Sequence, residues 1–222
     1  MQAQAAVFDC DGLLLDSTHA WAQSFSMIAA ELGHEMTAAE HARTVGSPVG
    51  TGAAVLSRIT GAPVNEVQAR VVKRFIEIAD VEPPRILSGA VSLVRTLHGT
   101  LPLAVASNGP TDIVTSMLRR SGLLDAFDAV CTSETAGAAK PDPAVYLTAC
   151  DRVHANPALS YGFADSEVGA RAVQAAGMHL VFIGEPAFDL TSGAITAPRL
   201  DDDRVIALFD RQCQPIGHRH GP

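Results

Sequence analysis

The chain opens with a short apolar segment and then changes to a pattern with helical spacing. Residues 5–8 are continuously apolar, which indicates a buried strand. From residue 17 to residue 32, large apolar side chains recur every three or four positions and predict a helix, with Ser17 as its N-cap and Gly33 just past its end. Two further helical patterns cover residues 49–59 and 64–79, and a proline pair at 83–84 follows them. No strand pattern is convincing between residues 17 and 84.

Beyond that proline pair, strand patterns alternate with helix patterns. The predicted strands are 103–106, 129–132, 161–164 and 179–183, and the predicted helices are 90–97, 112–120, 143–153 and 167–176. Asp142 and Ser166 are suited to cap the last two helices. This alternation is typical of a doubly wound parallel α/β sheet, and the helical block after the first strand indicates an insertion. We therefore expect an α/β core formed by 1–16 and 85–222, with a helical cap over 17–84.

Composition narrows the classes of partner and location. The 222 residues are 47% hydrophobic and 18% charged, which predicts a packed globular core. A formal net charge of -8 argues against a nucleic-acid groove or an anionic membrane surface as the main partner. The N-terminus lacks a signal-peptide pattern and no segment is apolar enough to span a membrane, so a cytoplasmic location is the expectation.

The cysteines and the C-terminal tail carry no predicted chemistry. The four cysteines are not spaced as in zinc sites, so free or buried thiols are expected at Cys10, Cys131, Cys150 and Cys213. Residues 211–222, with His218 and His220, show no apolar periodicity and are read as a flexible end. Oligomeric state is left open by the sequence.

Two carboxylates and a glycine directly follow the first strand, as Asp9, Asp11 and Gly12. Further polar residues follow later strands, in the order Ser107 and Asn108, Lys140, and Asp165. Because the carboxyl ends of parallel strands meet at one edge of the sheet, these side chains are expected to converge there.

Each residue type in this set has a task if the substrate is a phosphate monoester. Asp9 can attack phosphorus and form an aspartyl-phosphate, and Asp11 can donate and then accept the proton. Mg²⁺ is the natural cation among such acids, with Asp9, Asp165 and a backbone carbonyl near Asp11 as expected ligands. Lys140, the Ser107 hydroxyl and backbone N–H groups around Asn108 would bind the phosphoryl oxygens.

These motifs resemble those of the haloacid dehalogenase-like (HAD) hydrolase superfamily. The matching runs are Asp9-Cys10-Asp11-Gly12-Leu13-Leu14-Leu15-Asp16-Ser17, Ala106-Ser107-Asn108, Lys140-Pro141 and Phe163-Ala164-Asp165-Ser166, and the resemblance covers about residues 5–183. The helical block is similar to the cap of the phosphoglycolate phosphatase and β-phosphoglucomutase branch. The resemblance implies a Rossmann-like core, a mobile cap, Asp9 as nucleophile, Asp11 as acid/base, Mg²⁺ on Asp9, Asp11 and Asp165, and phosphate binding by Gly12, Ser107, Asn108 and Lys140. An aspartate at position 11 favours phosphate transfer over dehalogenation.

One position departs from the pattern of many relatives, which carry Glu immediately before the last aspartate. Here that residue is Ala164, and the metal shell would lose a carboxylate. Glu167 is a possible replacement, although a carboxylate in the first turn of a helix is also explained by the helix dipole.

A Mg²⁺-dependent phosphatase of a small phosphorylated metabolite is the leading hypothesis, and two alternatives stay open. A mutase of the β-phosphoglucomutase kind would use a His and an Arg in the cap, where this chain has Trp21 and Val49. A non-catalytic phosphate- or partner-binding protein is suggested by Ala164, although the retention of both Asp9 and Asp11 speaks against it. His19 is read as a packed or partly exposed cap residue near the mouth of the cleft, and Arg43 as a surface residue. A cap with Lys73 as its only lysine suggests a substrate with one phosphate and a neutral body.

Overall fold

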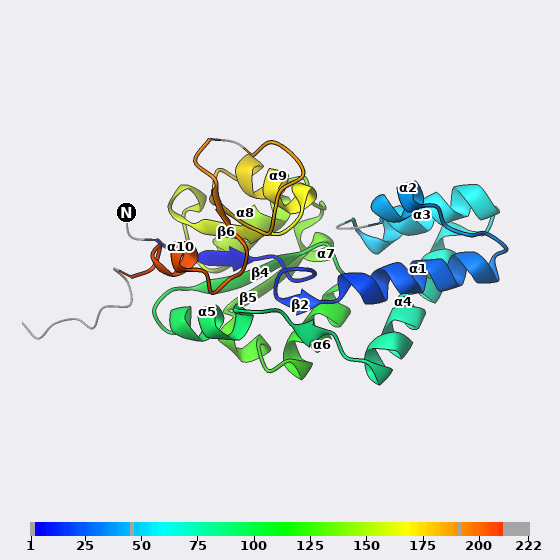
Figure 1. Cartoon of the computed structure of the whole chain (residues 1–222), viewed down its shortest axis with the longest axis horizontal. Coiled ribbons are helices and arrows are strands. Elements are labelled where there is room, and N and C mark those ends of the chain that lie inside the picture. The colour runs from blue at the N-terminus through cyan, green and yellow to red at the C-terminus, as the bar shows by residue number, and fades with distance from the viewer. Residues whose placement is uncertain (1–2, 45–46, 191, 211–222) are drawn as a thin grey trace, which may run out of the picture.

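A six-stranded, entirely parallel sheet forms the centre of the larger part of the molecule (Figure 1). This computed structural model describes residues 3–44, 47–190 and 192–210. The strands, in spatial order, are β5 (Ala129–Thr132), β4 (Leu103–Ser107), β1 (Ala6–Phe8), β6 (Tyr161–Ala164), β7 (His179–Ile183) and β8 (Ile195–Ala197). The first strand therefore lies between β4 and β6, and the strand order reverses beside it, which is where doubly wound sheets bind ligands.

Helices cover both faces of this sheet. Figure 1 shows α8 and α9 on one face and α5 and α6 on the other. The core helices are α5 (Ala90–Leu97), α6 (Thr111–Arg120), α7 (Ser133–Ala136), α8 (Ala144–Arg152), α9 (Glu167–Ala175) and α10 (Asp203–Ile206), with 3₁₀ turns at Leu124–Ala126 and Pro157–Leu159. Alternate side chains of β1 enter different hydrophobic clusters: Phe8 packs in the cluster with α5 and α6, and Val7 in the cluster with α8 and α9. The expected doubly wound α/β core is confirmed.

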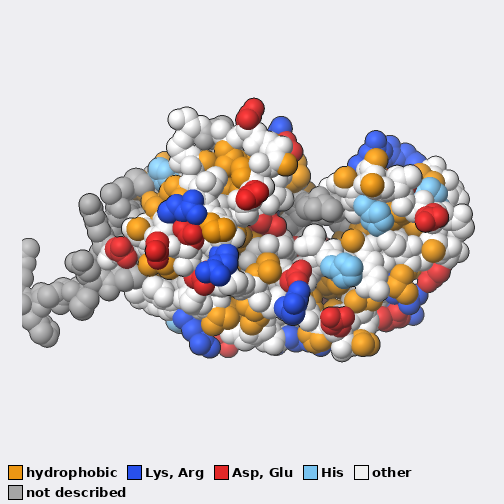
Figure 2. All heavy atoms as spheres, in the orientation of Figure 1, with side chains coloured by type: hydrophobic (Ala, Val, Ile, Leu, Met, Phe, Trp, Pro, Cys, Tyr) orange, Lys and Arg blue, Asp and Glu red, His pale blue; other side chains and the backbone are white. Residues whose placement is uncertain are grey.

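Four helices form a separate bundle beside the sheet, the helical cap. They are α1 (Thr18–Glu31), α2 (Ala38–Ala42), α3 (Val49–Thr60) and α4 (Val64–Val81). The cap has its own apolar cluster, built around Phe25, Leu56 and Val71. Figure 2 shows a notch between the core and the cap, with side chains of both charges interspersed over the face in view.

The two segments that connect the core to the cap lie side by side. β2 (Leu15–Asp16) and β3 (Arg85–Ile86) form a small antiparallel sheet, and the Arg85 guanidinium lies 2.7 Å from Asp16 Oδ2. A second ion pair, 2.7 Å from Asp80 on α4 to Arg120 on α6, connects the cap directly to the core. These pairings support the predicted boundaries at residues 16 and 85, which stay a prediction.

Most predicted elements are present within one or two residues of their predicted ends, with some local corrections. Ser17 occupies the N-cap position of α1, but its side chain makes no capping bond, because its hydroxyl is donated to Asp11 instead. Ser166 caps α9 as predicted, whereas α8 begins after Pro143, one residue later than expected. Cys10, Cys131 and Cys150 are buried free thiols, and Cys213 and the predicted tail lie outside the described residues. None of the described helices combines the length and the apolar composition that crossing a membrane requires.

Candidate active site

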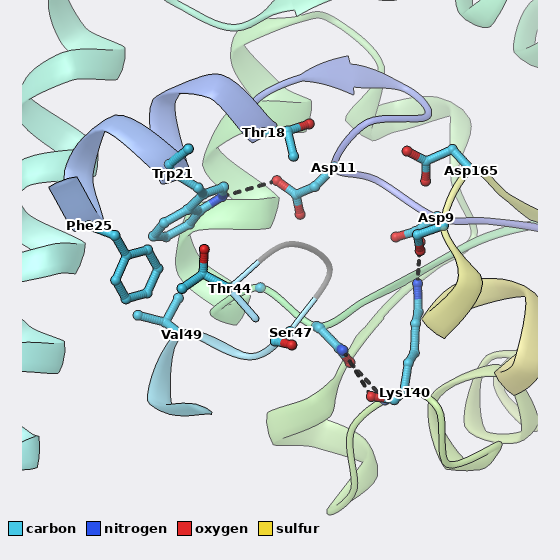
Figure 3. A pocket seen from close by; sticks show the side chains of 14 residues that line it. Asp9, Asp11, Thr18, Trp21, Phe25, Thr44, Ser47, Val49, Lys140 and Asp165 are labelled. Atoms are coloured by element: carbon cyan, nitrogen blue, oxygen red, sulfur yellow. Dashed lines mark hydrogen bonds and ion pairs between the residues drawn. The ribbon is translucent and has the colours of Figure 1, made fainter. Parts of the chain in front are cut away.

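Most of the polar residues that the sequence places at strand ends line one cavity between the core and the cap, namely Asp9, Asp11, Asn108, Lys140 and Asp165 (Figure 3). Ser107 is not part of this lining, but its hydroxyl donates to Asp11. Asp9 directly follows β1, and Asn108 and Asp165 follow its two neighbours in the sheet, β4 and β6. Lys140 reaches the same place from the segment between α7 and α8. The structure therefore brings these side chains together, as the sequence predicted.

Asp9 and Lys140 form a buried ion pair at the base of this cavity. The Lys140 ammonium lies 2.7 Å from Asp9 Oδ2, and the two side chains are only 2% and 9% exposed. The other carboxylate oxygen of Asp9 accepts the Cys10 backbone N–H at 2.8 Å. A charge pair this deeply buried is costly to desolvate, and such pairs are typical of functional sites rather than of sites kept for stability.

Two residues hold Lys140 in place. The side-chain amide of Asn108 makes two hydrogen bonds with the Lys140 backbone. It accepts the Lys140 N–H at 2.9 Å and donates to the Lys140 carbonyl at 3.3 Å. The ammonium group lies 5.0 Å from the centre of the buried Tyr146 ring, and the Tyr146 hydroxyl donates to the Phe163 carbonyl. The side chain of Asn108 therefore positions Lys140, and the predicted phosphate contacts of Asn108 stay a prediction. Sequence reasoning missed Tyr146, because nothing in the sequence shows that its ring lies against the Lys140 ammonium.

Asp11 is turned toward three hydrogen-bond donors. Its Oδ1 accepts the Ser17 hydroxyl at 2.5 Å and the Trp21 indole N–H at 3.2 Å, while its Oδ2 accepts the Ser107 hydroxyl at 3.2 Å. Burial, and secondarily the charge of Asp9, raise the pKa of Asp11, although these hydrogen bonds oppose the rise. A carboxyl with a raised pKa retains a proton more readily, which is the property an acid catalyst needs.

Two glycines make room for this arrangement. Gly12 has φ +83°, and a Cβ there would lie 2.2 Å from Asp165 Oδ2, so no other residue fits without moving the carboxylate. At Gly109, a Cβ would approach Val114 to 2.9 Å, and the Gly109 N–H donates to the Ser107 hydroxyl at 2.9 Å. The predicted roles of Gly12 and Ser107 in phosphate binding stay predictions.

The surroundings of Asp165 fit a hard divalent cation. Its Oδ1 is buried and has no hydrogen-bond partner, and burial together with the charge of Asp9 raises its pKa to about 7. A cation held by oxygen atoms would satisfy that orphaned acceptor and would relieve the repulsion between the two carboxylates. The described residues contain no cluster of three or more acidic, His or Cys side chains arranged around one metal position. The Asp9 and Asp165 carboxylates, which line the cavity together, are the side chains that would hold such a cation.

Ala164 and Glu167 differ sharply in where they lie. Ala164 is fully buried, and the first turn of α9 packs against it so closely that a Cβ on Gly169 would lie 3.0 Å from the Ala164 methyl and 3.1 Å from Asp9 Oδ2. Glu167 is exposed and pairs with Arg171 at 2.5 Å, one turn along the same helix. Nothing in this arrangement brings Glu167 to the cavity, so it does not replace the missing carboxylate.

The cap contributes only uncharged side chains to the described lining of the cavity. These are Thr18, Trp21, Ala22, Phe25, Thr44, Ser47 and Val49. Trp21 and Val49, the positions compared above with the His and Arg of mutases, are both in this wall (Figure 3). His19 and Arg43 are both exposed and neither is among the described residues that line the cavity, which fits the reading of Arg43 as a surface residue.

Several curated proteins with similar sequences are phosphatases. The chain is 30% identical over 198 residues to the validoxylamine A 7'-phosphate phosphatase of Streptomyces hygroscopicus subsp. limoneus, covering 80% of this chain and 84% of that protein. It is 28% identical to hexitol phosphatase B of Escherichia coli strain K12, covering 83% and 85% of the two chains.

Solved structures share the whole fold. A β-phosphoglucomutase from Clostridium difficile superposes with a TM-score of 0.81 at 16% identity, covering 95% of this chain and 97% of that one. CbbY from Rhodobacter sphaeroides, solved in complex with phosphate, gives a TM-score of 0.76 at 21% identity, covering 88% and 93%. The family model described as haloacid dehalogenase-like hydrolase matches residues 6–183, well over half of the sequence. The chain therefore belongs to the haloacid dehalogenase-like hydrolases, a family of enzymes.

Proposed function

We propose that this enzyme is a Mg²⁺-dependent phosphatase that hydrolyses a small phosphorylated metabolite through an aspartyl-phosphate on Asp9. The observation that carries the proposal is the contact between Asp9 and Lys140, 2.7 Å apart and almost fully buried, beside a second carboxyl with a raised pKa. A nucleophile, a fixed cation and a proton carrier are thus within one cavity.

In the first step, a carboxylate oxygen of Asp9 attacks phosphorus, and the bond from phosphorus to the ester oxygen breaks. Asp11 gives its proton to the departing oxygen, so that the alcohol leaves uncharged. Lys140 offsets the negative charge of the phosphoryl oxygens throughout, from a position that the Asn108 amide keeps fixed.

In the second step, water attacks the same phosphorus and the bond to Asp9 breaks. Asp11, now ionised, takes a proton from that water, and inorganic phosphate is released with Asp9 restored. A divalent cation such as Mg²⁺, held by Asp9, Asp165 and the Asp11 carbonyl, would supply the charge neutralisation that lets a dianionic phosphate approach two carboxylates.

For the substrate we propose a monophosphate of a small neutral polyol or sugar. The described cap residues around the cavity offer hydroxyls and apolar surface but no charge that would bind a second phosphate. The names of the curated relatives, among them a hexitol phosphatase and a fructose-1-phosphate phosphatase, support the same class. Trp21 and Val49 leave the cap without the ionisable pair of a mutase, which favours hydrolysis over phosphate transfer between sugars.

The direct test is phosphate release from a panel of phosphorylated metabolites, assayed with Mg²⁺ and with EDTA. We expect release that depends on Mg²⁺ and falls at least about 1,000-fold in Asp9→Asn, because the nucleophile is then lost. Conversion between sugar phosphates without release of phosphate would overturn the phosphatase in favour of a mutase. Binding of phosphate esters with no turnover of any of them would favour the non-catalytic alternative.

A further inference from the structure

Phe25 connects the cap's apolar core to the active-site cavity. It lies on α1, is 2% exposed, and packs in the cap cluster with Ala53 and Leu56. The same residue lines the cavity that holds Asp9 and Lys140, beside Val49 and opposite the core (Figure 3). Its position therefore determines how far the cavity extends into the cap.

The Phe25 ring rests on a gap left by a glycine of α3. A Cβ on Gly52 would lie 2.5 Å from Phe25 Cζ and 2.7 Å from Cε1, which is closer than real contacts allow. The same Cβ would lie 3.1 Å from the methyl group of Thr44, another cavity residue. The backbone at Gly52 has no positive φ, and glycine lowers the stability of a helix interior, so this contact is the physical reason for glycine at that position.

The direction in which Phe25 could move is limited by its neighbours. On the side of the cap core, Ala53 and Leu56 are fully buried and close-packed. On its other side the Phe25 side chain lines the cavity, which is open space. A methyl group at position 52 would accordingly push the Phe25 ring toward the cavity and shorten the cavity. A smaller side chain at position 25 would lengthen the cavity.

We propose that Phe25, seated on Gly52, sets the depth of the cap side of the cavity and so determines the length of substrate body that the enzyme accepts. The inference rests on the proposed phosphatase function for its natural substrate. It concerns the part of the substrate beyond the phosphate, since the core residues that contact the reacting group do not touch Gly52.

The main variant is Gly52→Ala, compared with Gly50→Ala as a matched control. Gly50 belongs to the same helix, and a Cβ there would meet only the amide tip of Gln68, 3.2 Å away, which can move aside. Two neutral polyol monophosphates of different length, glycerol 3-phosphate and sorbitol 6-phosphate, serve as probes. We expect the ratio of kcat/KM for the longer ester to that for the shorter one to fall about tenfold or more in Gly52→Ala and to be unchanged in Gly50→Ala.

A second variant and a second measurement keep the test independent of one substitution and of turnover. Phe25→Leu shortens the side chain and should raise the same ratio about threefold or more, even if Gly52→Ala does not fold. Trp21 is the only tryptophan of the chain and lines the cavity, so its fluorescence can report binding of each ester to an Asp9→Asn background. The ratio of the two Kd values should change in the same directions.

The outcomes separate the inference from the proposed function. An unchanged ratio in folded Gly52→Ala, or in Phe25→Leu, would overturn the role of Phe25 while leaving the phosphatase intact. If the wild type releases no phosphate but Gly52→Ala weakens binding of the sorbitol ester alone, the proposed function fails and the role of Phe25 is supported. If neither ester binds the wild type, the inference is overturned as well.

Discussion

The two halves of the cavity are built in opposite ways. On the core side, charged groups are buried and some are fixed by a partner from another element, as Lys140 is by Asn108 and Asp11 is by Ser107. On the cap side, the described lining is apolar or carries hydroxyl groups, and its shape depends on how Phe25 packs on Gly52. The core half can therefore carry the chemistry, while the cap half is suited to select by size.

The cap does contain charge, but its ion pairs lie on exposed surfaces. Glu31 on α1 accepts Arg70 at 2.7 Å and Arg74 at 2.6 Å from α4, with side chains 29% to 40% exposed. Such pairs contribute little each, because water screens them. The Asp9 and Lys140 pair differs from these cap pairs in being shielded from water.

Among the changes considered in this Discussion, removing the buried charge of Lys140 should have the largest effect on activity. Lys140→Met keeps the length and most of the volume of the side chain but loses its charge, so kcat/KM for phosphate release should fall about 100- to 1,000-fold. Lys73, whose side chain is 80% exposed on the cap, provides the matched control, and Lys73→Met should remain within twofold of the wild type. An active Lys140→Met enzyme would show that the core half does not depend on this charge.

Trp21 connects the two halves, since it lies on the cap helix α1 and donates to Asp11 in the core. Trp21→Phe removes that N–H and retains a ring that can stack on Phe75, whose centroid lies 3.8 Å away. We expect kcat to fall about tenfold with KM changed less than threefold, since one hydrogen bond to a charged group is lost.

Phe75→Leu is the complementary variant for Trp21, because it removes the stack and retains the indole N–H. It should leave kcat closer to the wild type than Trp21→Phe does. The opposite order would mean that the cap affects the chemistry through packing and not through the hydrogen bond.

The buried carboxylate of Asp165 in the core half should lower the stability of the folded protein. Thermal unfolding measured over a series of pH values can show this. The folded pKa of Asp165 is about 7, raised by burial and by Asp9, while an unfolded Asp titrates near 3.9. Its stability contribution is then fully present below about pH 4 and is lost as pH rises through 7. In metal-free protein, Asp165→Asn should raise Tm by about 3 °C or more at pH 8 and by less at pH 5.

The exposed Asp151 serves as the control for that measurement, because Asp151→Asn changes the same chemical group outside the cavity. It should show no comparable difference between pH 5 and pH 8. A similar rise in Tm for both variants at pH 8 would assign the effect to net charge and not to the buried site.

The smallest expected effect concerns the contact between the halves. Asp80 on α4 and Arg120 on α6 are 2.7 Å apart, and their side chains are 61% and 45% exposed. A double-mutant cycle with Asp80→Ala and Arg120→Ala should give a coupling energy of about 0.2–1 kcal/mol in urea unfolding, with kcat/KM within twofold. A coupling energy above about 2 kcal/mol would mean that this pair controls how the cap is placed.

The sequence was most informative about the core half of the site. Apolar runs of strand length ended in polar residues, and parallel strands must present such ends together, so Asp9, Ser107 and Asp165 could be brought together from local patterns. Three of the four cap helices, α1, α3 and α4, were equally visible, because their apolar positions follow the helical period, whereas the short α2 was not predicted. Strands β2, β3 and β8 were not predicted, since they are only two or three residues long and, unlike β1, do not form a continuous apolar run.

Contacts between distant residues account for what the sequence did not reveal. The amide of Asn108 and the ring of Tyr146 are chemically ordinary, and only the folded chain shows that both support Lys140. Ser17 had the right identity and position for an N-cap, yet its side chain is turned toward Asp11, to which its hydroxyl donates, and it accepts no backbone N–H of α1. The tight fit of Phe25 on Gly52 likewise depends on how two helices cross and leaves no mark in the pattern of either.

The depth of Lys140 has a consequence for chemical labelling. The chain has two lysines, and their side chains are 80% exposed at Lys73 and 2% exposed at Lys140. An amine acylating reagent should therefore modify Lys73 within minutes, while Lys140 should react only when the cap and the core separate or the protein unfolds. The ratio of the two adducts in a peptide mass spectrum would then count cap openings, with Lys73 as the internal standard.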